Sequence, residues 1–348
     1  MPPPIETQRY YRPELDILRF FAFFLVFLSH VVPGTANPLL VAVAAGGAFG
    51  VDLFFALSSF LITTLLLREQ HACGTIDVSS FYLRRILRIW PLYFAFLLIV
   101  VPLVRYVLPN DDMPLKYTAA FALLAGNWAC ALWGYPHTVA GPLWSVSIEE
   151  QFYLTWPLIM RRWIRHLTVV ALTLLAVSFI TRFWLVFHGA IHPQIWCNTL
   201  ARLDPIACGA LLAVYAQRKE IALSRGVRVA LLLFGFAVLT AAGRYGDFVG
   251  TRALITFPAV AAACVALILG TLGMRIPSRH SSIARALIYL GRISYGLYVF
   301  HLLFIYLLGS ALAALPATIA VAAASYHFFE KPFLRLKTRF ARIASRPI

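Results

Sequence analysis

The chain has 348 residues, of which 61% are hydrophobic and 13% charged, and its mean hydropathy is +0.80. This composition excludes an ordinary water-soluble globular domain. A net charge of +16 could suggest nucleic acid, but basic residues beside membrane spans are the usual result of anchoring at one membrane face. We therefore expect no nucleic-acid partner.

Apolar runs of about 17 to 25 residues, long enough to cross a hydrocarbon core as helices, recur from one end of the sequence to the other. The sequence therefore predicts an all-α fold, a polytopic bundle of about ten transmembrane helices. The expected spans lie near residues 15–33, 45–67, 89–108, 143–160, 167–187, 199–216, 227–243, 252–273, 287–308 and 312–329.

The first span follows a polar stretch, residues 1–14, which we expect to form an N-terminal cytoplasmic tail. No small-residue cleavage site follows the apolar run, which favours a retained span over a signal peptide. This span carries Arg19 and His30. Eleven residues of helix rise about 16 Å and complete about three turns, so both side chains are expected on one face.

The second span contains FGVDLFFALSSFLIT (49–63), with Asp52 and Ser58. Before the third span, YLRRILRIWP (82–91) contains a cluster of three arginines, Arg84, Arg85 and Arg88, at spacings that present them on neighbouring helix faces. Guanidinium groups bind phosphate bidentately. Anchoring of the following span at the membrane face explains why this segment is basic. The tight cluster of three arginines instead favours a phosphate site.

The apolar stretch 117–133 decides the topology. If it crosses, there are eleven spans and the basic loops divide between the two sides. If it does not, ten spans remain and most of the 30 lysines and arginines fall on one side. The positive-inside rule selects ten spans with both termini cytoplasmic, and 117–133 is then re-entrant or interfacial.

Under this topology several ionisable residues fall in the outer half of the bundle, near His30. A neutral imidazole can remove a hydroxyl proton, and a carboxylate can orient the imidazole and stabilise its cation. Taken singly, such groups are more often hydrogen-bond partners between helices, but their convergence at one depth favours catalysis. We predict His30 and Glu149 as the catalytic pair, supported by Glu150, Asp52, Ser58, Asp204, Arg202 and His301.

Nothing in the sequence predicts a metal or a permanently bound cofactor. The pair His188 and His192 has no third ligand nearby, and the five cysteines are scattered without a ligand spacing. Basic residues of the C-terminal segment 331–348 recur at near-helical spacing. We expect this segment to be a cytoplasmic tail on the anionic inner leaflet, a membrane anchor and not a site.

The order of these motifs resembles the membrane acyltransferase 3 family, bacterial integral-membrane O-acyltransferases that act on polysaccharides, lipid-linked sugars or antibiotics. The resemblance covers about residues 10 to 335, and we assign 15–330 as the acyltransferase domain. It is carried by Arg19-x10-His30, GVDLFFALSSFLIT, RRILRIWP, WSVSIEEQFYLTWP, RLDPIACGALLA, LGRISYGLYVFH and FFEKPFLRL, in family order.

This resemblance implies an acyl donor such as acetyl-CoA that arrives from the cytoplasm as a co-substrate. It implies a catalytic histidine at His30, a motif glutamate at Glu149, and functional arginines at Arg19, Arg84, Arg85 and Arg88. The family usually has glycine where this chain has Ser59. Some relatives carry an appended hydrolase-like domain that we do not expect here, so the acceptor would be presented by the bundle or a partner.

The expected function is O-acylation of a sugar hydroxyl on a surface polysaccharide or lipid-linked glycan, in the bacterial cytoplasmic (inner) membrane. A transporter of acyl groups or lipid-linked sugars could use the same buried charges, although no internal repeat is visible. A scaffold for envelope assembly is a third reading. The sequence leaves open the acceptor sugar, the acyl group and the oligomeric state.

Overall fold

The computed structural model describes residues 10–219, 221–276, 281–341 and 343. These residues form helices joined by short loops, and no β-strand occurs among them. The α-helices are α1 (Pro13–Val31), α2 (Pro38–Gly47), α3 (Gly50–Cys73), α4 (Val78–Ala95), α5 (Val101–Val104), α6 (Leu115–Ala122), α7 (Gly126–Trp133), α8 (Leu143–Trp163), α9 (Leu167–Phe187), α10 (Asp204–Arg218), α11 (Arg225–Tyr245), α12 (Ala253–Thr271), α13 (Ser282–Arg292), α14 (Ser294–Leu308), α15 (Ala311–Ala324) and α16 (Lys331–Thr338). Short π- and 3₁₀-helical turns are η2 (Phe96–Val100), η3 (Ile164–His166), η4 (Leu200–Arg202) and η5 (Ser325–Glu330).

Local sequence explains several helix ends. Pro13 starts α1, where its missing N–H costs nothing. The Asp77 side chain caps α4 by accepting a hydrogen bond from the Ser80 N–H. Gly74 and Gly309 end α3 and α14 in the left-handed conformation that glycine adopts without strain. These signals set where each helix of the bundle begins and stops.

The all-α membrane fold predicted from the sequence is confirmed. Within the described residues, six continuous helical segments are long and apolar enough to cross a membrane, and the α13–α14 pair, bent by 77°, would make a seventh. Each of the ten predicted ranges contains a helix. However, α10 has only 15 residues, and α1 carries Glu14, Asp16 and Arg19. Ten crossings and the side of each terminus therefore stay predictions.

The ambiguous stretch 117–133 forms two short helices, α6 and α7, separated by a turn at residues 123–125. Each has eight residues, which is about 12 Å of helix and far less than the core of a bilayer. Neither helix alone can cross a bilayer, which is consistent with a re-entrant or interfacial segment. Arg9 and Arg279, which contribute to the predicted inner charge, lie outside the described residues, as does most of the tail 1–14.

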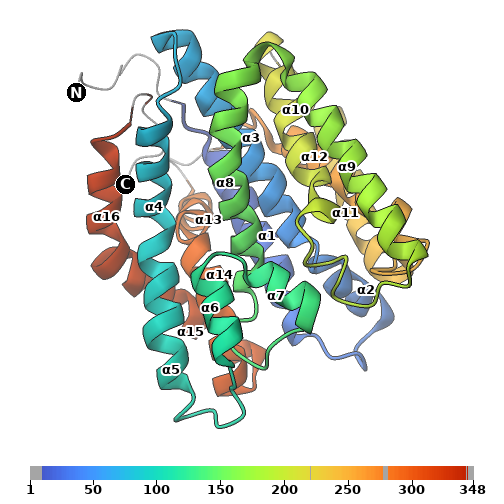
Figure 1. Cartoon of the computed structure of the whole chain (residues 1–348), viewed down its shortest axis with the longest axis vertical. Helices are drawn as coiled ribbons and strands as arrows, with labels where there is room; N and C mark the ends of the chain where they lie inside the picture. The colour runs from blue at the N-terminus through green and yellow to red at the C-terminus, as the bar shows by residue number, and fades with distance from the viewer. Residues whose placement is uncertain (1–9, 220, 277–280, 342, 344–348) are drawn as a thin grey trace.

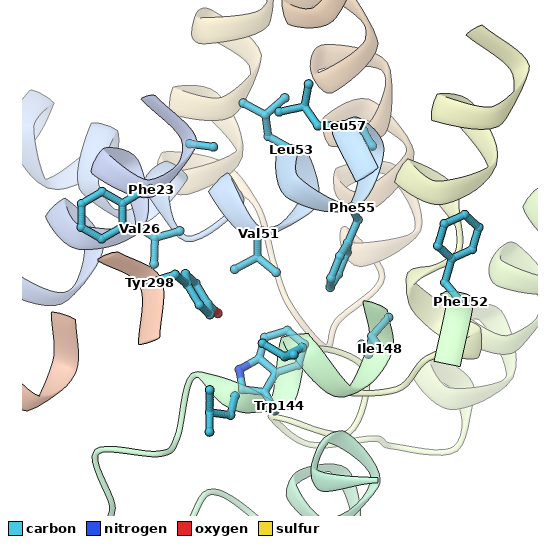
Figure 2. Close-up of a cluster of buried hydrophobic side chains, with 14 of the residues drawn as sticks. Phe23, Val26, Val51, Leu53, Phe55, Leu57, Trp144, Ile148, Phe152 and Tyr298 are labelled. Carbon is cyan, nitrogen blue, oxygen red and sulfur yellow. The ribbon is translucent and has the colours of Figure 1, made fainter. Parts of the chain in front are cut away.

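The helices form a central group with a group on each side (Figure 1). Helices α1, α3 and α8 lie in the middle, α9 to α12 lie on one side, and α4, α5 and α16 lie on the other. The apolar core fills the space between α1, α3 and α8, with Phe23, Leu53 and Ile148 fully buried there (Figure 2). The side chains that line cavities come from these same central helices.

Helices α3 and α10 approach each other closely. A Cβ atom at Gly209 of α10 would lie 2.3 Å from the Ala56 carbonyl oxygen and 3.1 Å from the Ser59 Cβ. The Ser59 hydroxyl donates a 2.6 Å hydrogen bond to the Ile206 carbonyl. Ser59 is therefore a packing residue between these two helices and lines no cavity described below.

Candidate functional site

Three cavities follow one face of α3 through the bundle. Residues of α3 at spacings of three and four line them in succession, which is the pattern of a single helix face. The histidine cavity has Val51 in its wall, and the central cavity has Val51, Phe54, Phe55 and Ser58. The basic cavity has Ser58, Leu61, Ile62 and Leu65. On α1, Arg19 lines the basic and central cavities and His30 the histidine cavity.

The basic cavity, of about 100 Å³, is surrounded by positive charge. Its cationic wall residues are Arg12, Arg19, Arg85, Arg88 and Lys337, and its one carboxylate is Asp16. Within the described residues, no ion pair reaches Arg19, Arg85, Arg88 or Lys337. The Nε atoms of Arg19 and Arg85 are buried without a hydrogen-bond partner. These side chains are half-buried, and positive charge without an ion pair in such surroundings favours an anion nearby.

Arg84, the first of the three clustered arginines, does not line this cavity. Its guanidinium forms a 3.2 Å ion pair with Glu69 of α3 and donates to the Phe340 carbonyl. Glu69 also accepts a hydrogen bond from the Asp77 N–H, so it ties the α3–α4 turn together. The basic cavity therefore brings together Arg85, Arg88 and Arg19, whereas Arg84 stabilises the α3–α4 turn.

Glu149 lies in the central cavity among the same arginines. Its two carboxylate oxygens accept hydrogen bonds from the Ser58 hydroxyl (2.9 Å) and the Tyr153 hydroxyl (3.0 Å). The central cavity, of about 60 Å³, also includes Arg19, Arg85 and Arg88 in its wall. Glu149 thus lies beside the arginines of the basic cavity and not beside His30.

The expected contact between Glu149 and His30 is not formed. The two residues line different cavities, and no hydrogen bond among the described residues joins them. Both carboxylate oxygens of Glu149 are instead taken up by the Ser58 and Tyr153 hydroxyl groups. The loop before α8 is packed into the protein, with Thr138, Val139 and Ala140 buried.

His30 faces the histidine cavity, which has a volume of about 510 Å³. Its ring folds back on α1, with Nδ1 2.8 Å from the Val26 carbonyl oxygen. A carbonyl can only accept, so Nδ1 carries the proton and Nε2 keeps its lone pair. The side chain is exposed to the cavity. His30 therefore presents a free base nitrogen to a space of ligand size.

His301 of α14 is the ring beside His30. The two ring centroids are 5.1 Å apart, with the rings steeply inclined to each other. His301 is fully buried, and its Nδ1 donates to the Tyr298 carbonyl at 2.6 Å. Its Nε2 has no hydrogen-bond partner. An imidazole, and not the expected carboxylate, is therefore the neighbour that can affect protonation of His30.

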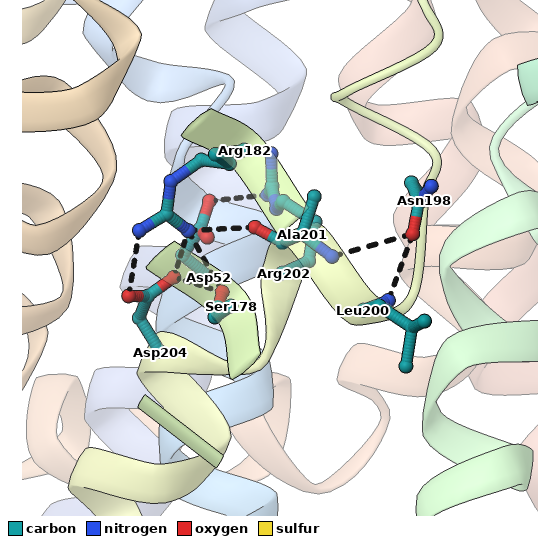
Figure 3. A network of polar contacts seen from close by, with 8 residues as sticks. All are labelled: Asp52, Ser178, Arg182, Asn198, Leu200, Ala201, Arg202 and Asp204. Atoms are coloured by element: carbon teal, nitrogen blue, oxygen red, sulfur yellow. Dashed lines mark hydrogen bonds and ion pairs between the residues drawn. The ribbon is translucent and has the colours of Figure 1, made fainter. Parts of the chain in front are cut away.

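The remaining supporting residues lie between helices. Arg202 pairs with Asp52 at 2.7 Å, and Arg182 pairs bidentately with Asp204, with its Nη2 2.9 Å from Oδ1 (Figure 3). All four side chains are buried, and none lines one of the three cavities. Glu150 accepts a hydrogen bond from the Trp90 indole at 2.9 Å. These contacts join α3 to η4, α9 to α10 and α4 to α8, as a packing role requires.

Sequence reasoning missed two parts of the site. Lys337 of α16 reaches the basic cavity, where its positive charge is repelled by those of Arg19, Arg85 and Arg88. Its segment was expected to be only an anchor. The histidine cavity also has an aromatic wall, which includes Tyr135, Trp144, His192, Trp196, Phe248 and Tyr306. Burial lowers the pKa of the His192 imidazole in the loop after α9. Aromatic residues alone carry no sequence signal for a ligand.

Comparison with known proteins places this geometry in a family. O-acetyltransferase OatA of Staphylococcus aureus (strain NCTC 8325 / PS 47) is 28% identical over 92% of this chain and 57% of its own length. Peptidoglycan O-acetyltransferase OatA of Listeria monocytogenes is 26% identical over 94% and 57%, and putative peptidoglycan O-acetyltransferase YrhL of Bacillus subtilis 29% over 99% and 58%.

The chain thus spans under three fifths of the length of these relatives. No solved structure matches it. Residues 12–327 match the family described as "Acyltransferase domain". That match covers most of the sequence and includes the motifs from Arg19 to LGRISYGLYVFH, which ends at His301. The chain belongs to the acyltransferase 3 family of membrane proteins.

Proposed function

We propose that this protein is a membrane O-acetyltransferase that moves an acetyl group from acetyl-CoA to a sugar hydroxyl of a cell-wall glycan. The observation that carries the proposal is the alignment along α1 and α3 of an unpaired cationic cavity at one end and a free imidazole nitrogen at the other. Relatives named peptidoglycan O-acetyltransferases favour a glycan acceptor.

The donor's phosphates suit the basic cavity. Arg19, Arg85, Arg88 and Lys337 come from three separate parts of the chain and form no ion pair among the described residues. A polyphosphate would supply the missing negative charge, and guanidinium groups bind it in a forked geometry. The protein would lie in a bacterial inner membrane with the basic cavity facing the cytoplasm. The donor would enter from that side, because coenzyme A is made in the cytoplasm.

The thioester would then reach the histidine cavity by way of the central cavity. Arg19 and His30 are about 16 Å apart along α1, on the order of the reach of a pantetheine arm. Glu149, hydrogen-bonded to Ser58 and Tyr153, would line this passage and balance the charge of Arg19. We therefore propose that Glu149 acts on the donor, and not that it orients the His30 ring.

The acceptor suits the histidine cavity, whose volume of about 510 Å³ is in the range of small-molecule sites. Aromatic faces such as Trp144 and Trp196 pack against the apolar C–H faces of a sugar ring. His30 Nε2 removes the proton of the attacking hydroxyl. The C–O bond forms as the C–S bond breaks, and the proton passes to the departing coenzyme A thiolate.

His301 has a defined place in this scheme. With its own Nδ1 proton held by the Tyr298 carbonyl, its Nε2 can only accept a hydrogen bond. An adjacent acceptor would favour the protonated state of His30 after the hydroxyl has lost its proton. His301 is therefore proposed as a positioning residue for the base.

The test is acetyl transfer by the purified chain in detergent, with acetyl-CoA and an oligomer of N-acetylglucosamine as the probe acceptor. His30→Ala should lower the transfer rate by about 10²- to 10⁴-fold, the usual contribution of a general base. The matched control is His188→Ala, because His188 makes the same Nδ1 bond to a carbonyl four residues earlier but lies outside the cavity.

Full activity of His30→Ala would overturn the role of the base. Because detergent leaves no sealed compartment, transfer under these conditions also excludes an account by transport alone. Absence of transfer by the unmodified chain, with folding intact, would contradict the proposed reaction with this acceptor class.

A further inference from the structure

The central and histidine cavities have two wall residues in common, Val51 of α3 and Tyr298 of α14. Both side chains are nearly buried, at 5% and 7% exposure. Figure 2 shows Val51 next to the Tyr298 ring, with Trp144 close to both. Since each residue faces a cavity on both of its sides, the pair stands between the donor end and the acceptor end of the path.

Both residues are held firmly in place. The Tyr298 hydroxyl donates to the Pro142 carbonyl at 3.0 Å and lies 2.7 Å from the Ser145 hydroxyl, which ties α14 to the start of α8. Val51 follows Gly50, where a Cβ would lie 2.4 Å from the Ala22 carbonyl oxygen of α1. This close helix contact fixes the first turn of α3. The two side chains thus form an ordered wall.

The spaces on either side of this wall differ greatly in size. The central cavity has a volume of about 60 Å³ and the histidine cavity about 510 Å³. A group that arrives from the donor end must therefore fit the small space and pass Val51 and Tyr298 before it meets His30. Branched or long acyl chains would collide with packed side chains that do not yield readily.

We infer that Val51 and Tyr298 form a partition that admits only a short acyl group, of acetyl size, to the histidine cavity, and that the Val51 side chain sets the length limit. This inference rests on the proposed function, because it assumes that an acyl group takes this route. The same partition separates the two ends of the path when no acyl group occupies it.

The first experiment measures acyl-length selectivity in detergent with acetyl-, propionyl- and butyryl-CoA, from the release of coenzyme A thiol with the N-acetylglucosamine oligomer as acceptor. Val51→Ala removes two methyl groups from the wall and should raise the propionyl-to-acetyl rate ratio about tenfold, the scale on which pockets discriminate one methylene. Val51→Phe should lower acetyl transfer while coenzyme A still binds.

The matched control is Val260→Ala on α12, which loses the same atoms from a fully buried position outside all three cavities. It should lose stability without a change in the rate ratio. An unchanged ratio in Val51→Ala, or the same change in Val260→Ala, would overturn the length limit at Val51.

The second experiment does not depend on transfer activity. Proteoliposomes that contain the unmodified chain should hold a proton gradient, read from an entrapped pH dye, whereas Val51→Ala/Tyr298→Ala should dissipate it faster. Circular dichroism checks that the double variant keeps its helices. Equal leakage would overturn the partition even if transfer works, while a closed partition in a chain without transfer would overturn only the proposed function.

Discussion

Two groups of buried charges occupy this bundle, and they are arranged in opposite ways. Between α3, α9 and α10, Arg182 and Arg202 are each paired with a carboxylate and lie away from the cavities. Between α1, α4 and α16, Arg19, Arg88 and Lys337 line a cavity without an ion pair among the described residues.

This difference distinguishes charged residues that stabilise the fold from charged residues that are available to a ligand. A charge buried with its partner joins helices, and its removal leaves the partner uncompensated. A charge that lines a cavity without a partner gains one only when a ligand binds. Substitutions in the first group should therefore affect folding, and those in the second should affect ligand binding.

The largest expected effect is on stability and comes from the paired group. Arg202→Met leaves Asp52 buried without its cation and should cost about 3–5 kcal/mol of folding free energy. Thermal unfolding in detergent measures it, together with the amount of protein in the membrane. The double change Asp52→Leu/Arg202→Leu should recover most of the loss, because an apolar pair leaves no unpaired charge. If Arg202→Met is as stable as the parent, the ion pair with Asp52 does not stabilise the fold and the contrast between the two groups fails.

The next effect concerns the donor and comes from the unpaired group. Lys337→Met should raise KM for acetyl-CoA about tenfold with little change in kcat, since a charge-assisted contact contributes about 1.5–3 kcal/mol to binding. Its matched control is Arg335→Met on the same short helix, whose side chain is exposed and outside the cavity. Equal KM changes in both variants would mean that α16 acts only through its general charge.

The smallest effect is expected at Ser59, in the packing between α3 and α10. Ser59→Gly removes the hydrogen bond to the Ile206 carbonyl. The loss should be about 1 kcal/mol of stability, with acyl transfer unchanged. A large change in KM for the donor would show instead that the serine lies on the route of the acyl group.

The sequence predicted the fold class and the face of α1 that carries Arg19 and His30 because both follow from apolar run length and helical period. It also predicted that arginines would cluster, but not that Glu69, fifteen residues before Arg84, would draw that residue into an ion pair. Such partners depend on how a chain turns between helices, which a linear spacing does not contain.

Depth was the weaker part of the prediction. Glu149 was expected near His30, but it lines the central cavity with Arg19 and Arg85, whereas His30 lines the histidine cavity. Lys337 was assigned to a membrane anchor because its spacing is also that of an interfacial helix, and only the packing of α16 against α4 brings it to the basic cavity. In both cases the position of the side chain depends on tertiary packing, which a local pattern does not contain.

The most direct test of the account is a titration of the purified chain with coenzyme A at low and high ionic strength. We predict saturable binding that weakens as salt rises, at least tenfold weaker in Arg88→Met, and unchanged in Arg335→Met. Binding of equal strength in the parent and in Arg88→Met, or no binding at all by the folded parent, would contradict the claim that the unpaired cations form the donor site.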